Sequence, residues 1–215
     1  MDAQDYDSWY ETPRGRWIGN RELELIADTL EMQPGESLLD VGCGTGYFTR
    51  GLARQHEGFV CGIDIKPAWV AHAAKKDDLH IDWKLGDAQA LAFADNSFDL
   101  VVSITALCFV EDERLAVQEM LRVARRRVVL GLLNRHSLLW WRKARAADQG
   151  AYQGAHWHSP CEARELFDGF AVTNVRLASA IWLPGAGWLA RQTEGLWPAW
   201  LHGGAFLLVA ADLNK

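Results

Sequence analysis

Apolar and polar positions along the chain follow two alternating patterns. Short apolar runs are typical of buried parallel strands. Five of them occur in the first 133 residues, at 37–41, 59–65, 81–85, 98–104 and 128–133. Beyond residue 133 this rhythm breaks, and two further strand-like runs follow at 172–178 and 205–210. Strands that alternate with helical stretches predict an α/β fold.

Helices are predicted where apolar residues recur at three- and four-residue spacing. They cover 20–31, 45–55, 67–75, a stretch that begins near 113, and 159–167. Residues 1–19 show no such period. Four arginines near the end of the fourth helix are expected to be solvated, because positive charge suits that end of the helix dipole. They are Arg122, Arg125, Arg126 and Arg127.

The stretch Leu38–Phe48, LLDVGCGTGYF, joins the first predicted strand to its helix through glycines at 42, 44 and 46. Glycine lets the backbone turn tightly and come close to a ligand. The dinucleotide-binding pattern G-x-G-x-x-G would need a glycine at position 47, which is Tyr. Asp40 lies in the strand end just before the loop, where a carboxylate would repel a pyrophosphate and suit a cationic ligand. An NAD-type dehydrogenase is therefore disfavoured.

Acidic residues also stand at the ends of the second and third predicted strands. Asp64 lies at the end of the second, where Rossmann-like folds place an acid that accepts hydrogen bonds from a ribose diol. Asp87 comes directly after the third strand. Because ligands of open α/β sheets bind at the carboxyl ends of the strands, we expect both acids and Asp40 to surround one ligand.

Composition narrows the class of protein further. The chain has 215 residues, of which 49% are hydrophobic, enough for one domain with a sizeable core. The net charge of −6 disfavours a nucleic-acid surface. Four scattered cysteines without a C-x-x-C pair are typical of reduced thiols, and no metal site is expected. The polar N-terminus and the lack of an 18-residue apolar run predict a cytoplasmic protein.

Four segments in order resemble the class I S-adenosylmethionine-dependent methyltransferases, most of all their small type 11 group. They are LLDVGCGTG, GIDI, GDAQALAFADNSFDLVVS and EMLRVARRRVVLG. The resemblance covers residues 35–132 strongly, and the later strands fit more loosely. It implies one domain over 1–215, built on a Rossmann-like, seven-stranded mixed sheet with helices on both faces and the last strand antiparallel. It also implies S-adenosylmethionine as cofactor and S-adenosylhomocysteine as product.

The resemblance assigns cofactor-binding roles to residues of the loop and the strand ends. They are Asp40, Gly42, Cys43, Gly44, Gly46, Asp64, Ile65, Asp87, Ala88, Ser103 and Thr105. In this family Asp64 would hold the ribose hydroxyls, Ile65 would pack on the adenine, and Asp87 would accept from the adenine amino group. Tyr10 and Arg16, together with Tyr6, would close over the cofactor from residues 1–34.

Nothing in the sequence identifies the methyl acceptor or its atom. Amino-methylating nucleic-acid enzymes carry an Asn/Asp-Pro-Pro-aromatic motif after the fourth strand, where this chain reads Ser103–Ala106. His136, His156 and His158 lie in the irregular segment over the expected site. They are candidates for a catalytic base, although each alone is more typical of a surface histidine. The alternative function is a non-catalytic S-adenosylmethionine-binding or regulatory protein, and the oligomeric state stays open.

Tryptophan is unusually frequent, and seven of the eleven tryptophans lie in two Trp-rich segments, residues 133–158 and 182–203. Four consecutive apolar residues, Leu138–Trp141, precede Arg142 and Lys143. Three interpretations are open: a local satellite core, a lid over a small apolar or aromatic acceptor, and contact with a membrane surface. The satellite core is favoured and the membrane least favoured. The partner predicted from the sequence is therefore a small-molecule acceptor.

Overall fold

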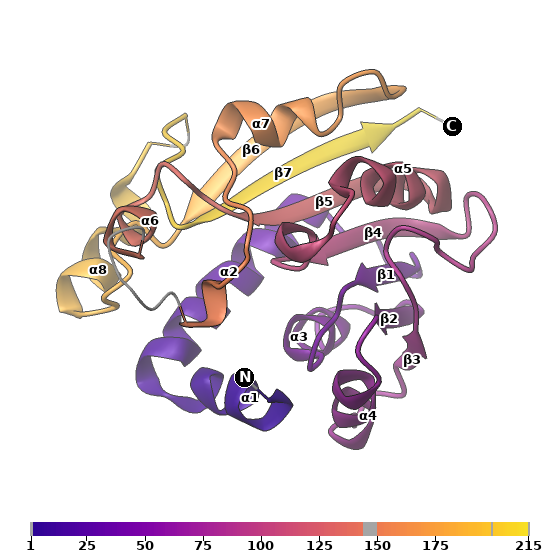
Figure 1. The fold of residues 1–215 in the computed structure, drawn as a ribbon, viewed down its shortest axis with the longest axis horizontal. Coiled ribbons are helices and arrows are strands. Elements are labelled where there is room, and N and C mark those ends of the chain that lie inside the picture. Colours follow the sequence, from indigo (N-terminus) through magenta and orange to yellow (C-terminus); the bar gives the residue numbers. More distant parts are fainter. Residues whose placement is uncertain (1, 144–149, 199, 215) are drawn as a thin grey trace.

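The computed structural model describes residues 2–143, 150–198 and 200–214. Seven strands form one sheet in the order β3-β2-β1-β4-β5-β7-β6 (Figure 1). They are β1 (Leu38–Val41), β2 (Val60–Asp64), β3 (Asp82–Leu85), β4 (Phe98–Ile104), β5 (Ala124–Leu133), β6 (Val172–Ala180) and β7 (Phe206–Leu213). β1 to β5 pair in parallel, and β7 runs antiparallel to both of its neighbours. The predicted Rossmann-like mixed sheet is confirmed.

Helices cover both faces of this sheet (Figure 1). They are α1 (Ala3–Glu11), α2 (Pro13–Leu30), α3 (Tyr47–Ala53), α4 (Pro67–Lys75), α5 (Glu113–Val123), α6 (Leu138–Lys143), α7 (Pro160–Glu165) and α8 (Trp188–Thr193). The short 3₁₀ helices are η1 (Leu107–Phe109), η2 (Gly150–Tyr152) and η3 (Glu194–Leu196). Buried residues of α5 and α7 pack on one face, and those of α1, α2 and α3 on the other.

The N-terminal segment is helical, although its sequence shows no clear period. Asp2 caps α1 by accepting from the Asp5 N–H, and Thr12 caps α2 by accepting from the Gly15 N–H. Pro13 stands at the first position of α2, where its missing N–H costs nothing. Capping therefore starts both helices, while contacts with the rest of the fold stabilise them.

The expectation that Arg125, Arg126 and Arg127 lie at a helix end is wrong, and Arg127 is buried rather than solvated. Helix α5 ends at Val123, and these arginines begin strand β5. The buried Arg127 guanidinium donates to Asp212 on β7 at 2.6 Å and to the Thr29 and Leu30 carbonyl oxygens at 2.9 and 3.1 Å. It thus joins β5 to β7 and to the C-terminal end of α2.

Connections that leave β5 and β6 lie at the same edge of the sheet as the carboxyl ends of β1 and β2. Both strands are antiparallel to β7, so β6 points the same way as β5. The buried Asn134 amide, just after β5, donates to the His202 and Gly204 carbonyl oxygens at 2.9 and 2.7 Å. These hydrogen bonds therefore join the two Trp-rich segments, 133–158 and 182–203, at the edge of the sheet formed by the carboxyl ends of the parallel strands, called the ligand edge below.

Tryptophans of these segments divide between packing and exposure. Trp182 and Trp197 stack with ring centroids 4.6 Å apart. Trp188 and Trp200 remain 72% and 76% exposed. A satellite core therefore accounts for only part of the set, and residues 144–149 lie outside the described residues. A search of the described helices finds none that is long and apolar enough to span a membrane.

Candidate functional site

The loop after β1 has the backbone of a ligand cradle. Gly42, Gly44 and Gly46 all have positive φ, at 77°, 58° and 78°, where side chains are disfavoured. A Cβ added to Gly42 would lie 2.2 Å from the Cβ of Ala106, which follows β4. A Cβ on Gly46 would lie 2.5 Å from the Trp83 ring. Glycine thus lets the loop approach the neighbouring strand ends closely.

Asp64 closes this loop from the end of β2. Its Oδ2 accepts from the Gly44 N–H and its Oδ1 from the Lys66 N–H, both at 2.9 Å. Each carboxylate oxygen keeps a second lone pair, so the group can still accept from two ligand hydroxyls. The adjacent Ile65 is 62% exposed. An acid beside an exposed apolar side chain suits a ribose joined to a flat base.

Asp40 is buried beneath the same loop. Its Oδ2 accepts from the Thr49 hydroxyl at 2.6 Å, while its Oδ1 has no partner among the described residues. Burial, with a smaller contribution from the charge of Asp64, raises the pKa of Asp40 to about 7. The buried hydroxyl of Ser103 is also unpartnered within the described chain. Because buried polar atoms normally have partners, Asp40 and Ser103 fit a polar, cationic ligand.

The remaining loops at this edge hold the other predicted cofactor residues. Asp87 is half-buried after β3, and its Oδ1 accepts from the Gln89 N–H at 2.9 Å. Ala88 packs against the core on the α5 side. Thr105 has a φ of 53° while its N–H donates to the Gly131 carbonyl oxygen. A β-branched residue in this conformation is strained, a feature that clusters at ligand sites.

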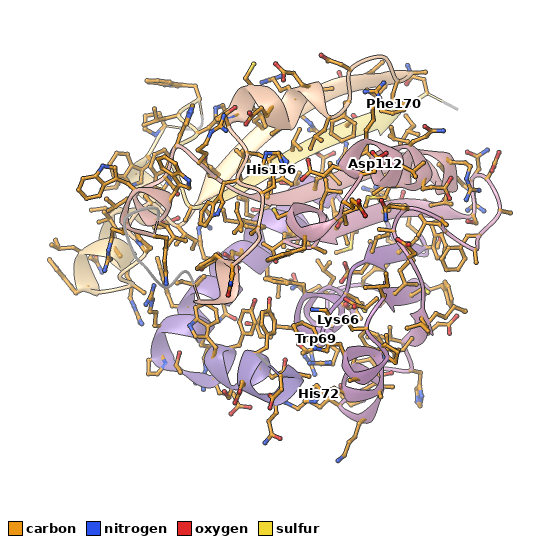
Figure 2. The ribbon with its side chains drawn as sticks, viewed as in Figure 1. Lys66, Trp69, His72, Asp112, His156 and Phe170 are labelled. Atoms are coloured by element: carbon orange, nitrogen blue, oxygen red, sulfur yellow. The ribbon has the colours of Figure 1, made fainter. Side chains whose placement is uncertain are left out.

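Helix α1 covers the glycine loop with aromatic rings. Tyr10 stacks on Tyr47 with ring centroids 3.7 Å apart, and Tyr6 contacts Trp69 at 5.3 Å. Lys66, Trp69 and His72 lie along α4 on the side toward α1 (Figure 2). Both tyrosines therefore lie beside the loop, and their contact with a cofactor stays a prediction.

Arg16 and Cys43 differ from the other predicted cofactor residues. Arg16 is exposed on α2, where it donates to the Glu11 carbonyl oxygen at 3.2 Å. Its charge acts on Tyr47 at the start of α3, and its contact with a cofactor stays a prediction. Cys43 is buried within the loop, its N–H donates to the Ile63 carbonyl oxygen, and burial raises the pKa of its thiol. Its contribution to the cradle therefore comes from the backbone.

Two of the three predicted histidines meet at a carboxylate. His156 Nδ1 and His158 Nε2 each lie 3.0 Å from an oxygen of Glu113, at the start of α5. Burial alone would raise the pKa of Glu113, but the two histidines lower it below its ordinary value. His136 lies apart from them, exposed on the turn after β5.

Residues 39–130 match the sequence pattern of a family described as a methyltransferase domain. This segment, which is less than half of the chain, is therefore similar to the type 11 methyltransferase family. Among curated relatives, a 2-methyl-6-phytyl-1,4-hydroquinone methyltransferase of Synechocystis sp. is 40% identical over 100 residues, which are 46% of this chain and 31% of that protein. A 2-phytyl-1,4-naphtoquinone methyltransferase of Thermosynechococcus vestitus is 38% identical over 104 residues, 46% of each protein. The chain thus matches less than half the length of these relatives.

Solved methyltransferase structures resemble the fold of nearly the whole chain. A possible histamine N-methyltransferase of Thermotoga maritima has a TM-score of 0.80 at 21% identity, covering 98% of this chain and 96% of that one. The magnesium protoporphyrin IX methyltransferase of Synechocystis, solved with S-adenosylhomocysteine, gives 0.63 at 17% identity, covering 92% and 84%. At these identities the likeness concerns the fold alone.

Two carboxyl groups near the methyltransferase domain's ligand edge escaped prediction from the sequence. Glu22 lies on α2, and burial raises its pKa to about 8. Its charge acts on Tyr6, Tyr10 and Tyr152, so it lies among aromatic rings. Glu113 is the other. Both stand in helical stretches with many polar residues, where a glutamate has no distinguishing pattern.

Proposed function

We propose that this protein transfers a methyl group from S-adenosylmethionine to a small, largely apolar or aromatic acceptor. One observation carries the proposal: the acids of β1 and β2 converge on a three-glycine loop within the segment that matches the methyltransferase family. The curated relatives that match this segment support the reaction class. Free cysteines within the described chain support a reducing, cytoplasmic location.

The residues of this edge suit the separate parts of the cofactor. In the proposal, Asp64 accepts from the ribose hydroxyls, Ile65 packs on the adenine, and Asp40 faces the cationic methionine end. Asp87 and the backbone of Ala88 would hold the far side of the adenine. The unpartnered oxygen of Asp40 and the exposed face of Ile65 support these roles.

S-adenosylmethionine supplies a methyl group that its sulfonium already activates. The protein's part is to orient the acceptor and exclude water, and good orientation is worth roughly 7–11 kcal/mol. Tyr6, Tyr10 and Trp69 form an aromatic cover over the loop. A sulfonium loses its charge during transfer, so a site with little water favours the reaction.

The acceptor class follows from the surface beside the site. Trp188, Leu196 and Trp200 are exposed on the segment that follows β6, at the ligand edge. The relatives named above act on quinones or hydroquinones with phytyl chains, which are small-molecule acceptors with apolar bodies. We propose that the exposed side chains form a lid that contacts a similarly apolar acceptor.

Calorimetry and a turnover assay test the proposal in sequence. S-adenosylhomocysteine is expected to bind the purified protein, and radiolabelled methyl groups are expected to pass from S-adenosylmethionine to at least one member of a panel of phenols and hydroquinones. A protein that binds neither S-adenosylmethionine nor S-adenosylhomocysteine contradicts the proposal. Tight binding without transfer to any acceptor of the panel would favour the non-catalytic alternative.

A further inference from the structure

A second cluster of polar side chains lies at the N-terminal end of α5, away from the glycine loop, and consists of Glu113, His156 and His158. Each offers one potential ligand atom, and the three atoms lie within 4.8 Å of one another. The two imidazoles reach different oxygens of the carboxylate: His156 Nδ1 lies 3.0 Å from Glu113 Oε1, and His158 Nε2 lies 3.0 Å from Glu113 Oε2. Zinc bonds to nitrogen and oxygen are about 2.0–2.2 Å long. Ligand atoms around such an ion therefore lie roughly 3 Å apart, close to the two imidazole-to-carboxylate distances here.

The backbone holds the two histidines in position. The N–H of His158 donates to the Leu133 carbonyl oxygen at 2.8 Å, and its carbonyl oxygen accepts from the Arg135 N–H. The N–H of His156 donates to the Cys108 carbonyl oxygen at 2.7 Å. Residues two apart in an extended segment point the same way, which explains why both imidazoles reach one carboxylate. The site is thus built before any ion enters.

The surroundings favour a cation. His158 is buried, whereas His156 is 53% exposed, so the cluster opens to solvent on one side. Beside it lies a shallow pocket of about 690 Å³, whose lining includes Glu111, Asp112 and Glu113. His156 and Asp112 border this region from two different segments (Figure 2). Two imidazoles and a carboxylate are the donor set that zinc and its neighbours in the first transition row prefer.

We propose that Glu113, His156 and His158 bind one divalent transition-metal ion of the zinc type. The ion fastens the segment that follows β5 to the first turn of α5 and leaves at least one coordination position toward the pocket. Metal binding here does not depend on the proposed methyl transfer, because none of its ligands contacts the glycine loop in the described structure. The competing account is a plain hydrogen-bonded cluster in which Glu113 accepts from both imidazoles.

Metal titration of the full chain decides between these accounts. The protein is stripped with a chelator, and Zn²⁺ alone is added in a calorimeter. One Zn²⁺ per chain is expected. His156→Ala, at an exposed side chain, and Glu113→Gln, which keeps the side-chain shape, should each weaken binding by roughly 10-fold or more. Zn²⁺ should also raise the melting temperature of the unsubstituted chain, and raise that of both variants less at the same Zn²⁺ concentration.

Matched variants identify adventitious binding. His80→Asn replaces an exposed histidine outside the cluster, and asparagine tolerates the positive φ of that position. Cys161→Ser removes the exposed thiol beside Glu165, the other side chain that could capture zinc. Both should bind Zn²⁺ as tightly as the unsubstituted chain. No Zn²⁺ binding, equal binding by His156→Ala and Glu113→Gln, or loss of binding in Cys161→Ser would each overturn the proposal.

Discussion

The Asp64 carboxylate accepts hydrogen bonds from the backbone N–H groups of Gly44 and Lys66, and each of its oxygens keeps a lone pair for a ligand. Asp64→Ala should weaken S-adenosylhomocysteine binding by at least about 10-fold, since one charge-assisted hydrogen bond is worth roughly 1.5–3 kcal/mol. Calorimetry measures the affinity, and a melting curve shows that the variant is folded. Asp78→Ala, at an exposed acid paired with Arg54, is the control and should bind normally. Unchanged affinity in folded Asp64→Ala would remove the ribose role.

The proposed role of Asp40 predicts that cofactor binding depends on pH. Its pKa is raised to about 7 in the free protein, so near neutrality only part of the population is ionised. A cationic ligand favours the ionised form, and S-adenosylmethionine binding should therefore strengthen as pH rises from 6 to 8. Asp40→Asn should bind more weakly and lose this contribution to the pH dependence. An equal pH dependence in both proteins would show that another group is responsible.

The raised pKa of Asp40 also affects folding stability, which should change with pH in the opposite direction to cofactor binding. The folded pKa of Asp40 lies above the unfolded value of about 3.9, so between these values the folded state binds more protons. The contribution of Asp40 to folding stability therefore falls as pH rises toward 7. The free energy of unfolding of Asp40→Asn, measured with denaturant, should gain on that of the unsubstituted chain over this interval.

Single residues were predictable where they follow a strong local pattern. Asp40, Asp64 and Asp87 come at the ends of apolar runs, and the structure places them at one edge of the sheet. Glu22 lacks such a marker, because its burial depends on α1 and the segment after β5 packing above it. Arg127 was misplaced because a cluster of arginines looks the same at the end of a helix and at the start of a strand.

At the scale of elements, α1 depends on one buried acid. Asp7 Oδ2 lies 2.8 Å from Lys76 Nζ and 3.0 Å from His72 Nε2, both on or beside α4, and 3.9 Å from the Arg50 guanidinium on α3. Burial alone would raise the pKa of Asp7, but the bonds from Lys76 and His72 lower it overall. The network attaches the aromatic cover to the cofactor-binding helices.

Asp7→Asn should therefore loosen α1 more than it perturbs the sheet. We expect a loss of about 1–3 kcal/mol in the free energy of unfolding, because charge-assisted bonds become neutral ones. Hydrogen exchange should speed up in α1 and stay slow in β4 and β5. The difference from the unsubstituted chain should hold at neutral pH and shrink as pH falls through the lowered pKa of Asp7.

Asp5→Asn is the matched control, since Asp5 is an exposed acid on the same helix. It should leave exchange in α1 nearly unchanged. If both substitutions had equal effects, the helix as a whole, rather than the buried network, would determine the stability of the cover.

Elements with strong apolar periods matched prediction closely, and those that depend on distant contacts did not. The structure has α4 at Pro67–Lys75 and β4 at Phe98–Ile104, as predicted. By contrast, α1 has no apolar stripe of its own and gains its stability from the rings and ions beneath it.

At the scale of the whole molecule, the family-matched segment is embedded in the rest of the chain. Strand β5 pairs with β4 on one side and with β7 on the other, and α2 covers the apolar face of β5 and β7. We propose that residues 1–215 work as one unit for this reason. A fragment of residues 36–133 would expose the edge of β5 that pairs with β7 and the apolar face that α2 covers. Circular dichroism should therefore find no cooperative melting transition in the fragment, whereas the full chain melts cooperatively. A folded fragment would contradict this.

Because β7 lies between β5 and β6 in the sheet, these strands cannot pair in the order in which they are synthesised. On the ribosome, residues 172–180 emerge before 206–213, yet among the described strands β6 is hydrogen-bonded to β7 alone. Strand β6 and the free edge of β5 must therefore wait, unpaired, until the later strand arrives between them. Such open strand edges attract other chains. A nascent chain stalled near residue 200 should accordingly be a client of chaperones, although its cofactor edge has already been synthesised.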